Sequence, residues 1–210
     1  MKITGVETLY LRQPQVKAQC DSGQDALIVK VTTDAGITGI GEVDSSPLAV
    51  QGAIEGPFSH TTTTGLREAV MGEDPFQTEY LWHKMYRANI YAGRRGIGIH
   101  AMSGIDMALW DIKGKALGLP IWKLLGGGFH KKLRCYASSL FGATPQATHD
   151  LARRFRDRGF NAVKFGWDPM GRDAKTDIAL VKQARKGLGD DADLLIDAGL
   201  VWDAKTAIQR

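Results

Sequence analysis

The sequence predicts an α+β domain followed by a series of alternating strands and helices. Three runs with sheet-forming patterns lie at the amino terminus, at residues 3–11, 26–33 and 37–43. The short connection Asp34-Ala35-Gly36 between the last two is typical of a hairpin. Beyond residue 130, strand patterns alternate with helical ones, as in parallel sheets. We therefore expect a three-stranded antiparallel meander, then helices, then βα units.

Composition places the chain among globular proteins. It has 210 residues, of which 43% are hydrophobic and 24% charged, with a formal net charge of +4. Basic residues are interleaved with acidic ones, as in the run RRFRDR at 153–158. Such a run is typical of a solvated helix face rather than a nucleic-acid surface, so we expect no nucleic-acid partner.

The two cysteines, Cys20 and Cys135, are far apart and form no CxxC pair. Neither a disulfide framework nor a structural zinc site is implied, which favours a reducing cytoplasm. The first residues lack the apolar core of a signal peptide, and no run approaches the roughly 18 apolar residues of a membrane helix. We expect a cytoplasmic protein with no membrane partner.

The middle of the chain predicts a group of helices. Short helical segments are expected at residues 49–54, 66–71 and 79–86, and a long one begins at Ile97 and ends at Gly118. Three residues on its apolar stripe are small (Ala101, Gly104 and Ala108), so another backbone can approach closely there. The polar segment Gln13–Asp25 predicts a loop that either covers a site or is an ordinary solvent loop.

The last third predicts three strands and three helices. The expected strands are Leu133–Ser139, a run from residue 161 that ends at Lys164, and Asp193–Asp197. Thr144 and Pro145 are typical of a helix start, and Asp173 and Asp203 are expected to begin the next two helices. We expect one face of the middle helix to be apolar, formed by Ile178, Val181, Ala184 and Leu188.

Lys164 and Asp197 are the candidate functional residues. They lie 33 positions apart, a natural length for one βαβ unit, so both are expected at the same end of the sheet. From the residues alone, two ordinary interpretations stay open. Lys164 could extend its stem to solvent at a strand end, and Asp197 could form a turn after its strand.

A longer sequence motif, at residues 101–126, favours one interpretation of these two residues. The string AMSGIDMALWDIKGK at residues 101–115, followed by PIWKLLG at 120–126, resembles the signature of the mandelate racemase and muconate lactonizing enzyme group of the enolase superfamily. This resemblance implies that residues 1–128 form an amino-terminal capping domain. It also implies that residues 129–210 form the first two and a half βα units of a (β/α)₈ TIM-type barrel.

The resemblance also assigns roles. Lys164 matches the first lysine of the K-x-K motif of the family and would be a catalytic cation that holds or polarises the substrate carboxylate. Asp197 matches the first ligand of an essential Mg²⁺. The implied reaction is removal of the proton α to a carboxylate, with Mg²⁺ as the one cofactor and a small carboxylic acid as substrate. Members of the group are expected to form homo-oligomers.

Two positions depart from the pattern of the family. Gly166 stands where the second lysine is expected, and Asp197-Ala198-Gly199 replaces Asp-x-Asn. A glycine cannot abstract a proton, so racemisation by two bases is disfavoured. The pattern favours an acid-sugar dehydratase, with a racemase or cycloisomerase of the same group as the alternative.

The number of residues in the last third of the chain is too small for a complete barrel. A complete barrel needs about 200 to 250 residues, whereas 80 residues follow His130. The other metal ligands and the general base are expected beyond Arg210. The alternative to an enzyme is a non-catalytic fragment that acts only in association with other chains.

Overall fold

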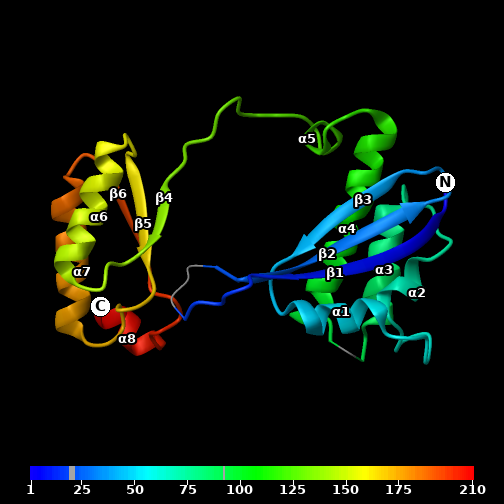
Figure 1. Ribbon diagram of the computed structural model, residues 1–210, viewed down its shortest axis with the longest axis horizontal. Coiled ribbons are helices and arrows are strands. Elements are labelled where there is room, and N and C mark those ends of the chain that lie inside the picture. The colour runs from blue at the N-terminus through cyan, green and yellow to red at the C-terminus, as the bar shows by residue number, and fades with distance from the viewer. Residues whose placement is uncertain (19–21, 92) are drawn as a thin grey trace. The chain divides into compact units, whose positions relative to one another are not determined.

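The computed structural model describes residues 1–18, 22–91 and 93–210. It divides into two compact units, Met1–Phe129 and His130–Arg210 (Figure 1). Each unit has its own sheet and its own hydrophobic core. The predicted fold class, an α+β domain followed by parallel βα units, is confirmed.

The first unit begins with the predicted meander. Strands β1 (Ile3–Arg12), β2 (Asp25–Thr33) and β3 (Thr38–Val43) pair antiparallel in the order β1-β2-β3. Leu27 and Val29 pair with Tyr10 and Thr8 on one side, and with Val43 and Gly41 on the other. Alternate residues of β2 are buried, which gives the sheet one face toward the core.

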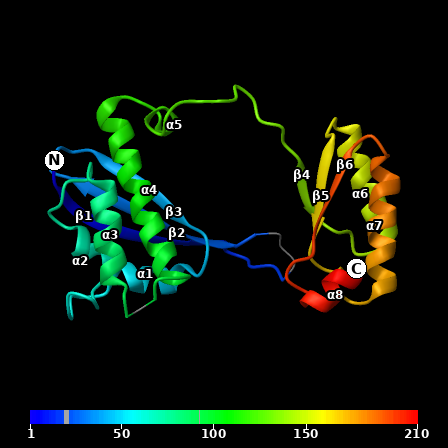
Figure 2. The same cartoon turned by 180° about the vertical axis from the view of Figure 1, so that it is seen from behind.

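Among the described residues, five helices follow the meander: α1 (Pro47–Glu55), α2 (Leu66–Val70), α3 (Thr78–Ala88), α4 (Ile97–Leu117) and α5 (Ile121–Leu124). Figure 2 shows α4 running along the sheet with α3 beside it. Ile105, Leu109 and Ile112 of α4 are fully buried in the core with Leu27 and Val29 of the sheet. The predicted apolar stripe is therefore the surface that joins helix and sheet.

Helix α4 lies unusually close to the sheet because small residues face each other across the contact. A Cβ atom added to Gly41 would lie 1.9 Å from the carbonyl oxygen of Gly104, and one added to Gly39 would lie 2.0 Å from that of Ala108. Side chains at 39 and 41 would push the helix away. The predicted close approach at Gly104 and Ala108 is confirmed.

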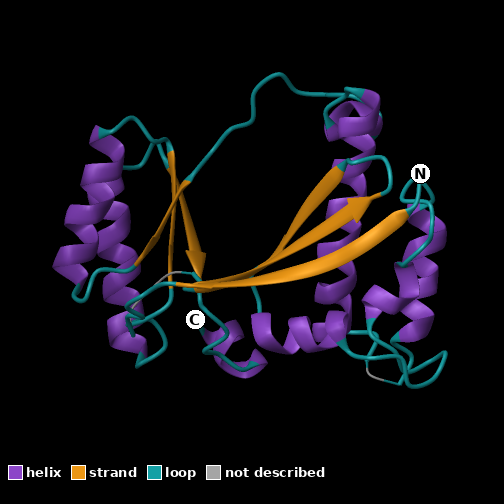
Figure 3. Ribbon diagram, turned by 45° about the vertical axis from the view of Figure 1, so that its right-hand side comes forward, coloured by secondary structure: helices purple, strands orange, loops and turns teal. Residues whose placement is uncertain are grey.

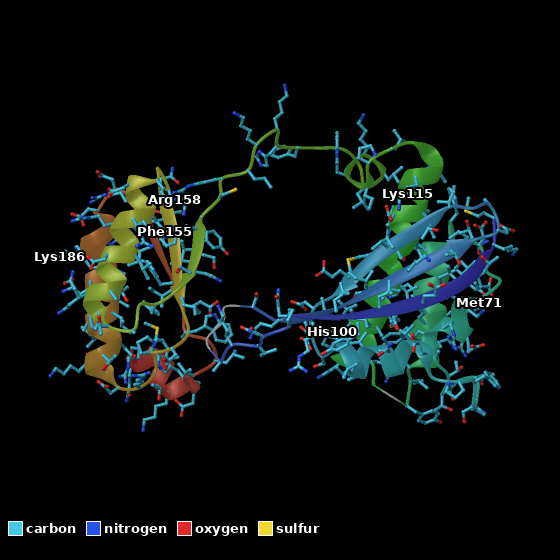
Figure 4. The ribbon with its side chains drawn as sticks, in the orientation of Figure 1. Met71, His100, Lys115, Phe155, Arg158 and Lys186 are labelled. Atoms are coloured by element: carbon cyan, nitrogen blue, oxygen red, sulfur yellow. The ribbon has the colours of Figure 1, made fainter. Side chains whose placement is uncertain are left out.

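Two charged residues of α4 bind the free edge of β3. The Ile40 N–H donates to Asp111 Oδ2 at 2.9 Å, and Lys115 Nζ donates to the Thr38 carbonyl at 2.7 Å (Lys115 is labelled in Figure 4). These bonds satisfy backbone groups that an edge strand leaves open, and they hold α4 in register along β3.

The second unit is a parallel sheet with helices packed on it. Strands β4 (Ala137–Leu140), β5 (Ala162–Gly166) and β6 (Asp193–Asp197) pair parallel in that order. They alternate with α6 (Pro145–Asp157), α7 (Ala174–Leu188) and α8 (Ala204–Gln209). Figure 3 shows α6 and α7 side by side on one face of the sheet. This repeated strand-helix order is that of a partial barrel.

Aromatic side chains form the core between this sheet and its helices. The rings of Phe141 and Phe165 stack with centroids 5.6 Å apart, and Phe155 of α6 meets Phe165 edge-on at 6.4 Å (Phe155 is labelled in Figure 4). Because Phe165 turns toward the helices, its neighbours Lys164 and Gly166 turn to the opposite face of the sheet.

Two sequence predictions in this unit are wrong in detail. The strand expected at Leu133–Ser139 begins only at Ala137, because residues 133–136 have no strand partner. Ile178 was expected on the buried face of α7 but is 51% exposed. Asp177 is buried instead, since its carboxylate accepts hydrogen bonds from the Gly171 N–H and from Arg210.

The helix starts were predicted correctly. Thr144 caps α6 by accepting from the Ala147 N–H, and Asp173 and Asp203 cap α7 and α8 in the same way. The predicted loop Gln13–Asp25 contains residues 19–21, which lie outside the described residues. Cys20 is one of them, so the structure does not test the prediction made for it. Among the described residues, no helix has both the length and the apolar character needed to cross a membrane.

Candidate active site at the carboxyl ends of the parallel strands

Strand register brings the two candidate residues together. Gly166 pairs with Asp197 and Lys164 with Leu195, so Asp197 ends β6 one side-chain layer beyond Lys164. The sequence placed Lys164 at the end of β5, which is wrong by two residues because the strand continues through Phe165 to Gly166. The long lysine side chain spans the difference.

The two side chains form an ion pair. Lys164 Nζ lies 3.1 Å from Asp197 Oδ2, with side-chain exposures of 28% and 37%. The prediction that both face the same end of the sheet is confirmed. Neither group is fully buried, so both remain accessible to a ligand from the carboxyl end of the sheet, the end that carries the chemistry in βα folds.

The surroundings favour the ionised form of Asp197. The Gly199 N–H donates to Asp197 Oδ1 at 3.0 Å, and Lys164 binds the other oxygen. These two contacts, the Gly199 N–H first and Lys164 second, hold the pKa of Asp197 below its ordinary value. Asp197 therefore presents a carboxylate at neutral pH.

Gly166 leaves no room for a side chain at its position. A Cβ atom there would lie 2.9 Å from both the Cβ and the carbonyl oxygen of Asp197. Real Cβ atoms do not approach other atoms this closely without a shift, and the carbonyl belongs to the paired strand β6. The place expected for a second lysine is filled by the neighbouring aspartate.

Sequence reasoning missed two aromatic residues beside the pair. The Tyr136 ring centroid lies 5.9 Å from Lys164 Nζ, within the range of a cation–π contact. Trp167 follows Gly166 and donates its N–H to the Asp197 carbonyl at 3.2 Å. The sequence contained a signal for Trp167, since Gly166 and Pro169 predict that the chain turns just after the strand.

One carboxylate of this cluster suits a hard divalent cation. Mg²⁺ prefers oxygen ligands and is commonly held by one or two carboxylates together with substrate oxygens and water. Asp197 is ionised and stands at a strand end, so its donor chemistry fits one ligand position. Within the described ranges, no three His, Cys, Asp or Glu side chains are grouped closely enough to hold a metal ion.

Comparison with known families identifies the chain. The profile of the mandelate racemase / muconate lactonizing enzyme N-terminal domain matches residues 3–126, and that of the enolase C-terminal domain-like family matches residues 147–210. The chain belongs to the mandelate racemase / muconate lactonizing enzyme family. This confirms the resemblance drawn from residues 101–126.

Curated relatives of this family are lyases and isomerases. A D-galactarolactone cycloisomerase of Agrobacterium fabrum is 33% identical over 99% of this chain and 54% of its own length. A D-galactonate dehydratase of Xanthomonas oryzae is 36% identical over 81% of this chain and 44% of its own length. An arabinonate dehydratase of Saccharolobus solfataricus is 32% identical over 92% of this chain and 50% of its own length. The chain spans about half the length of the curated relatives it matches.

Solved structures give the same family. A structure from Rhodobacter sphaeroides, described as a predicted mandelate racemase, matches with a TM-score of 0.84 and 38% identity over 98% of this chain and 53% of its own. A mandelate racemase/muconate lactonizing protein from Paracoccus denitrificans, complexed with magnesium, matches with a TM-score of 0.81 and 30% identity. The match covers 99% of this chain and 54% of that protein.

Proposed function

We propose that this chain contributes to an acid-sugar dehydratase that removes the proton α to a carboxylate and expels the β-hydroxyl as water. The ion pair of Lys164 with Asp197 at the carboxyl ends of β5 and β6 is the observation that carries the proposal. The dehydratases of galactonate and arabinonate among the relatives support the substrate class, a sugar acid.

Lys164 is proposed as the catalytic cation. Its ammonium group lies within reach of a carboxylate, as its contact with Asp197 demonstrates. A substrate carboxylate bound there would gain negative charge when the α-proton leaves, because the electron pair moves from the C–H bond onto the carboxylate oxygens. A fixed positive charge beside those oxygens lowers the energy of the transition state more than that of the bound substrate.

Asp197 is proposed as one ligand of Mg²⁺. When bound, this ion would supply a second positive charge that stabilises the enediolate formed from the substrate. The ionised state and position of Asp197 support this role, as does the magnesium complex from Paracoccus denitrificans. The family relationship supports further oxygen ligands in the complete protein.

Gly166 favours dehydration over racemisation by two bases. Racemisation needs a second base on the opposite face of the α-carbon, and the position that would present it on β5 has no space for a side chain. Dehydration needs one base at C2 and an acid at the leaving hydroxyl of C3. The enol product then takes a proton at C3 and becomes a 2-keto-3-deoxy acid.

An assay of the complete protein tests this function. Aldonic and aldaric acids of five and six carbons are incubated with and without Mg²⁺, and 2-keto-3-deoxy acids are measured. We expect Mg²⁺-dependent formation of this product from at least one acid. Clear racemase or cycloisomerase turnover without any 2-keto-3-deoxy product would contradict the dehydratase assignment and favour the alternative, which the D-galactarolactone cycloisomerase relative represents.

Three further parts of the hypothesis remain predictions. The capping role of residues 1–128 with barrel units from residue 129 is proposed from the family, as is assembly into a homo-oligomer. A cytoplasmic location is proposed from the sequence. Size-exclusion chromatography with light scattering measures the oligomeric state; a complete protein that stays monomeric would contradict the prediction of a homo-oligomer.

A further inference from the structure

Trp167 has a backbone conformation that bulky residues rarely adopt. Its φ angle is +66°, in the left-handed region, although it is not glycine. Two hydrogen bonds hold the residue there: its N–H donates to the Asp197 carbonyl at 3.2 Å, and its own carbonyl accepts from the Met170 N–H at 3.0 Å. Strained residues of this kind concentrate at functional sites.

The indole ring lies on the turn that follows β6. A Cβ atom added to Gly199 would lie 2.7, 3.1 and 3.3 Å from Cε3, Cδ2 and Cζ3 of Trp167, all atoms of the six-membered ring. Only a glycine permits this contact. The same Gly199 donates its N–H to Asp197 Oδ1, so a single residue links the ring to the proposed metal ligand.

The ring is nevertheless accessible. Trp167 is 47% exposed, and it does not belong to the apolar core between the sheet and α6 and α7. Tryptophan has the largest surface of any side chain, so this exposed fraction leaves a broad aromatic area open to a ligand. Here the backbone is strained and Gly199 has no side chain, so an aromatic surface lies on the turn whose Gly199 N–H binds the Asp197 carboxylate.

We propose that Trp167 is a specificity-determining residue whose indole ring contacts the carbon chain of a polyhydroxylated acid. Lys164 is proposed to recognise the carboxylate end, which all small 2-hydroxy acids share. The C–H groups along one face of a sugar acid form an apolar strip that matches an aromatic ring, and such surfaces line ligand sites beside a few polar groups. Trp167 thus selects acids with a long carbon chain over short ones.

This inference rests on the proposed function, and the test separates the two. Dissociation constants of the complete protein are measured for a six-carbon aldonate and for glycerate, which has the carboxylate, the α-hydrogen and the β-hydroxyl but no further carbons. Trp167→Leu is expected to weaken aldonate binding about tenfold, the size of one lost aromatic contact, and glycerate binding less than about twofold.

Matched variants make the result specific. Trp122→Phe removes a tryptophan of similar exposure, 54%, in the first unit and is expected to change neither constant. Aldonate binding is also expected to change tryptophan fluorescence in wild type and in Trp122→Phe but not in Trp167→Phe.

Two results would overturn the inference. Equal weakening of aldonate and glycerate by Trp167→Leu would show a structural role, and no weakening of either would show no role. If instead Trp167 discriminates the acids as expected while no 2-keto-3-deoxy product forms, the inference about recognition stands and the dehydratase assignment fails.

Discussion

Glycine contacts serve different ends in the two units. In the first unit, Gly41 faces Gly104 so that α4 can lie directly on the sheet, and the result is a tightly packed core. In the second unit, Gly166 makes room for Asp197 and Gly199 makes room for the ring of Trp167. There the space is taken by a charged and an aromatic side chain at the strand ends. Close backbone approach therefore contributes to stability in one unit and to a candidate site in the other.

The largest effect is expected at the strand ends. Asp197→Asn removes the charge of the proposed metal ligand while keeping its shape, so Mg²⁺-dependent turnover of the complete protein should fall by about a thousandfold. Asp193→Asn, at the opposite end of β6, is the matched control and should retain activity. Steady-state kinetics of both variants measures the difference, and equal activity in the two would remove Asp197 from the site.

Packing in the first unit is tested at Gly41. Gly41→Ala places a Cβ atom against the Gly104 carbonyl and should reduce the free energy of unfolding by about 3 kcal/mol, the upper range for overpacking. Gly52→Ala is the control, because a Cβ at this position in α1 meets no atom within 4 Å. It should raise stability by about 0.5 to 1 kcal/mol. Urea titration measures both, and a neutral Gly41→Ala would contradict the close contact.

Lys164 tests carboxylate recognition. Lys164→Ala removes a charged hydrogen-bond donor, which should lower kcat/KM for the acid about 10- to 100-fold. Lys186→Ala, an exposed lysine on α7, is the control and should leave kcat/KM unchanged. Initial rates over a range of substrate concentrations measure kcat/KM, and a value for Lys164→Ala equal to wild type would refute its role.

A smaller effect is expected at a helix start in the second unit. Thr144→Ala removes the side-chain cap of α6, which accepts from the Ala147 N–H at 3.2 Å, and should cost about 1 kcal/mol of stability. Thr144→Ser retains the cap and should remain near wild type. Thermal or urea unfolding distinguishes the variants, and equal losses in both would show that the cap contributes nothing.

The smallest effect depends on pH. The Thr176 hydroxyl first, and then the Thr176 N–H, hold the pKa of Asp173 below its ordinary value of 3.8. A lowered folded-state pKa means that this contribution to stability is present above the ordinary value and is lost as pH falls through the folded value. Wild type should therefore lose stability relative to Asp173→Asn below about pH 4. A constant difference between the two from about pH 6 to pH 2 would contradict this.

Much of the fold could be predicted because its signals are local. The hairpin at Asp34–Gly36, the caps at Thr144 and Asp173 and the apolar stripe of α4 each depend on a few neighbouring residues. The errors arose where distant residues decide. Ile178 is exposed because Asp177 takes the buried position through its contacts with Gly171 and Arg210.

The candidate site was predicted in part for the same reason. A spacing of 33 residues in a βαβ unit places Lys164 and Asp197 at one end of the sheet, and the structure brings them into contact. The packing of Asp197 against Gly166, and of Trp167 on Gly199, depends on strand register and on a left-handed residue. Neither is encoded in a short stretch of sequence, so the aromatic part of the site emerged only from the structure.

We propose that the strand ends of β5 and β6 serve dehydration rather than racemisation by two bases. The most direct test is the reaction of a sugar acid with the complete protein and Mg²⁺ in deuterated water, followed by NMR. We predict that the product is a 2-keto-3-deoxy acid with one deuterium at C3. We also predict that no C2 epimer of the substrate carrying deuterium is recovered. Recovery of the C2 epimer carrying deuterium, without the keto acid, would contradict the account.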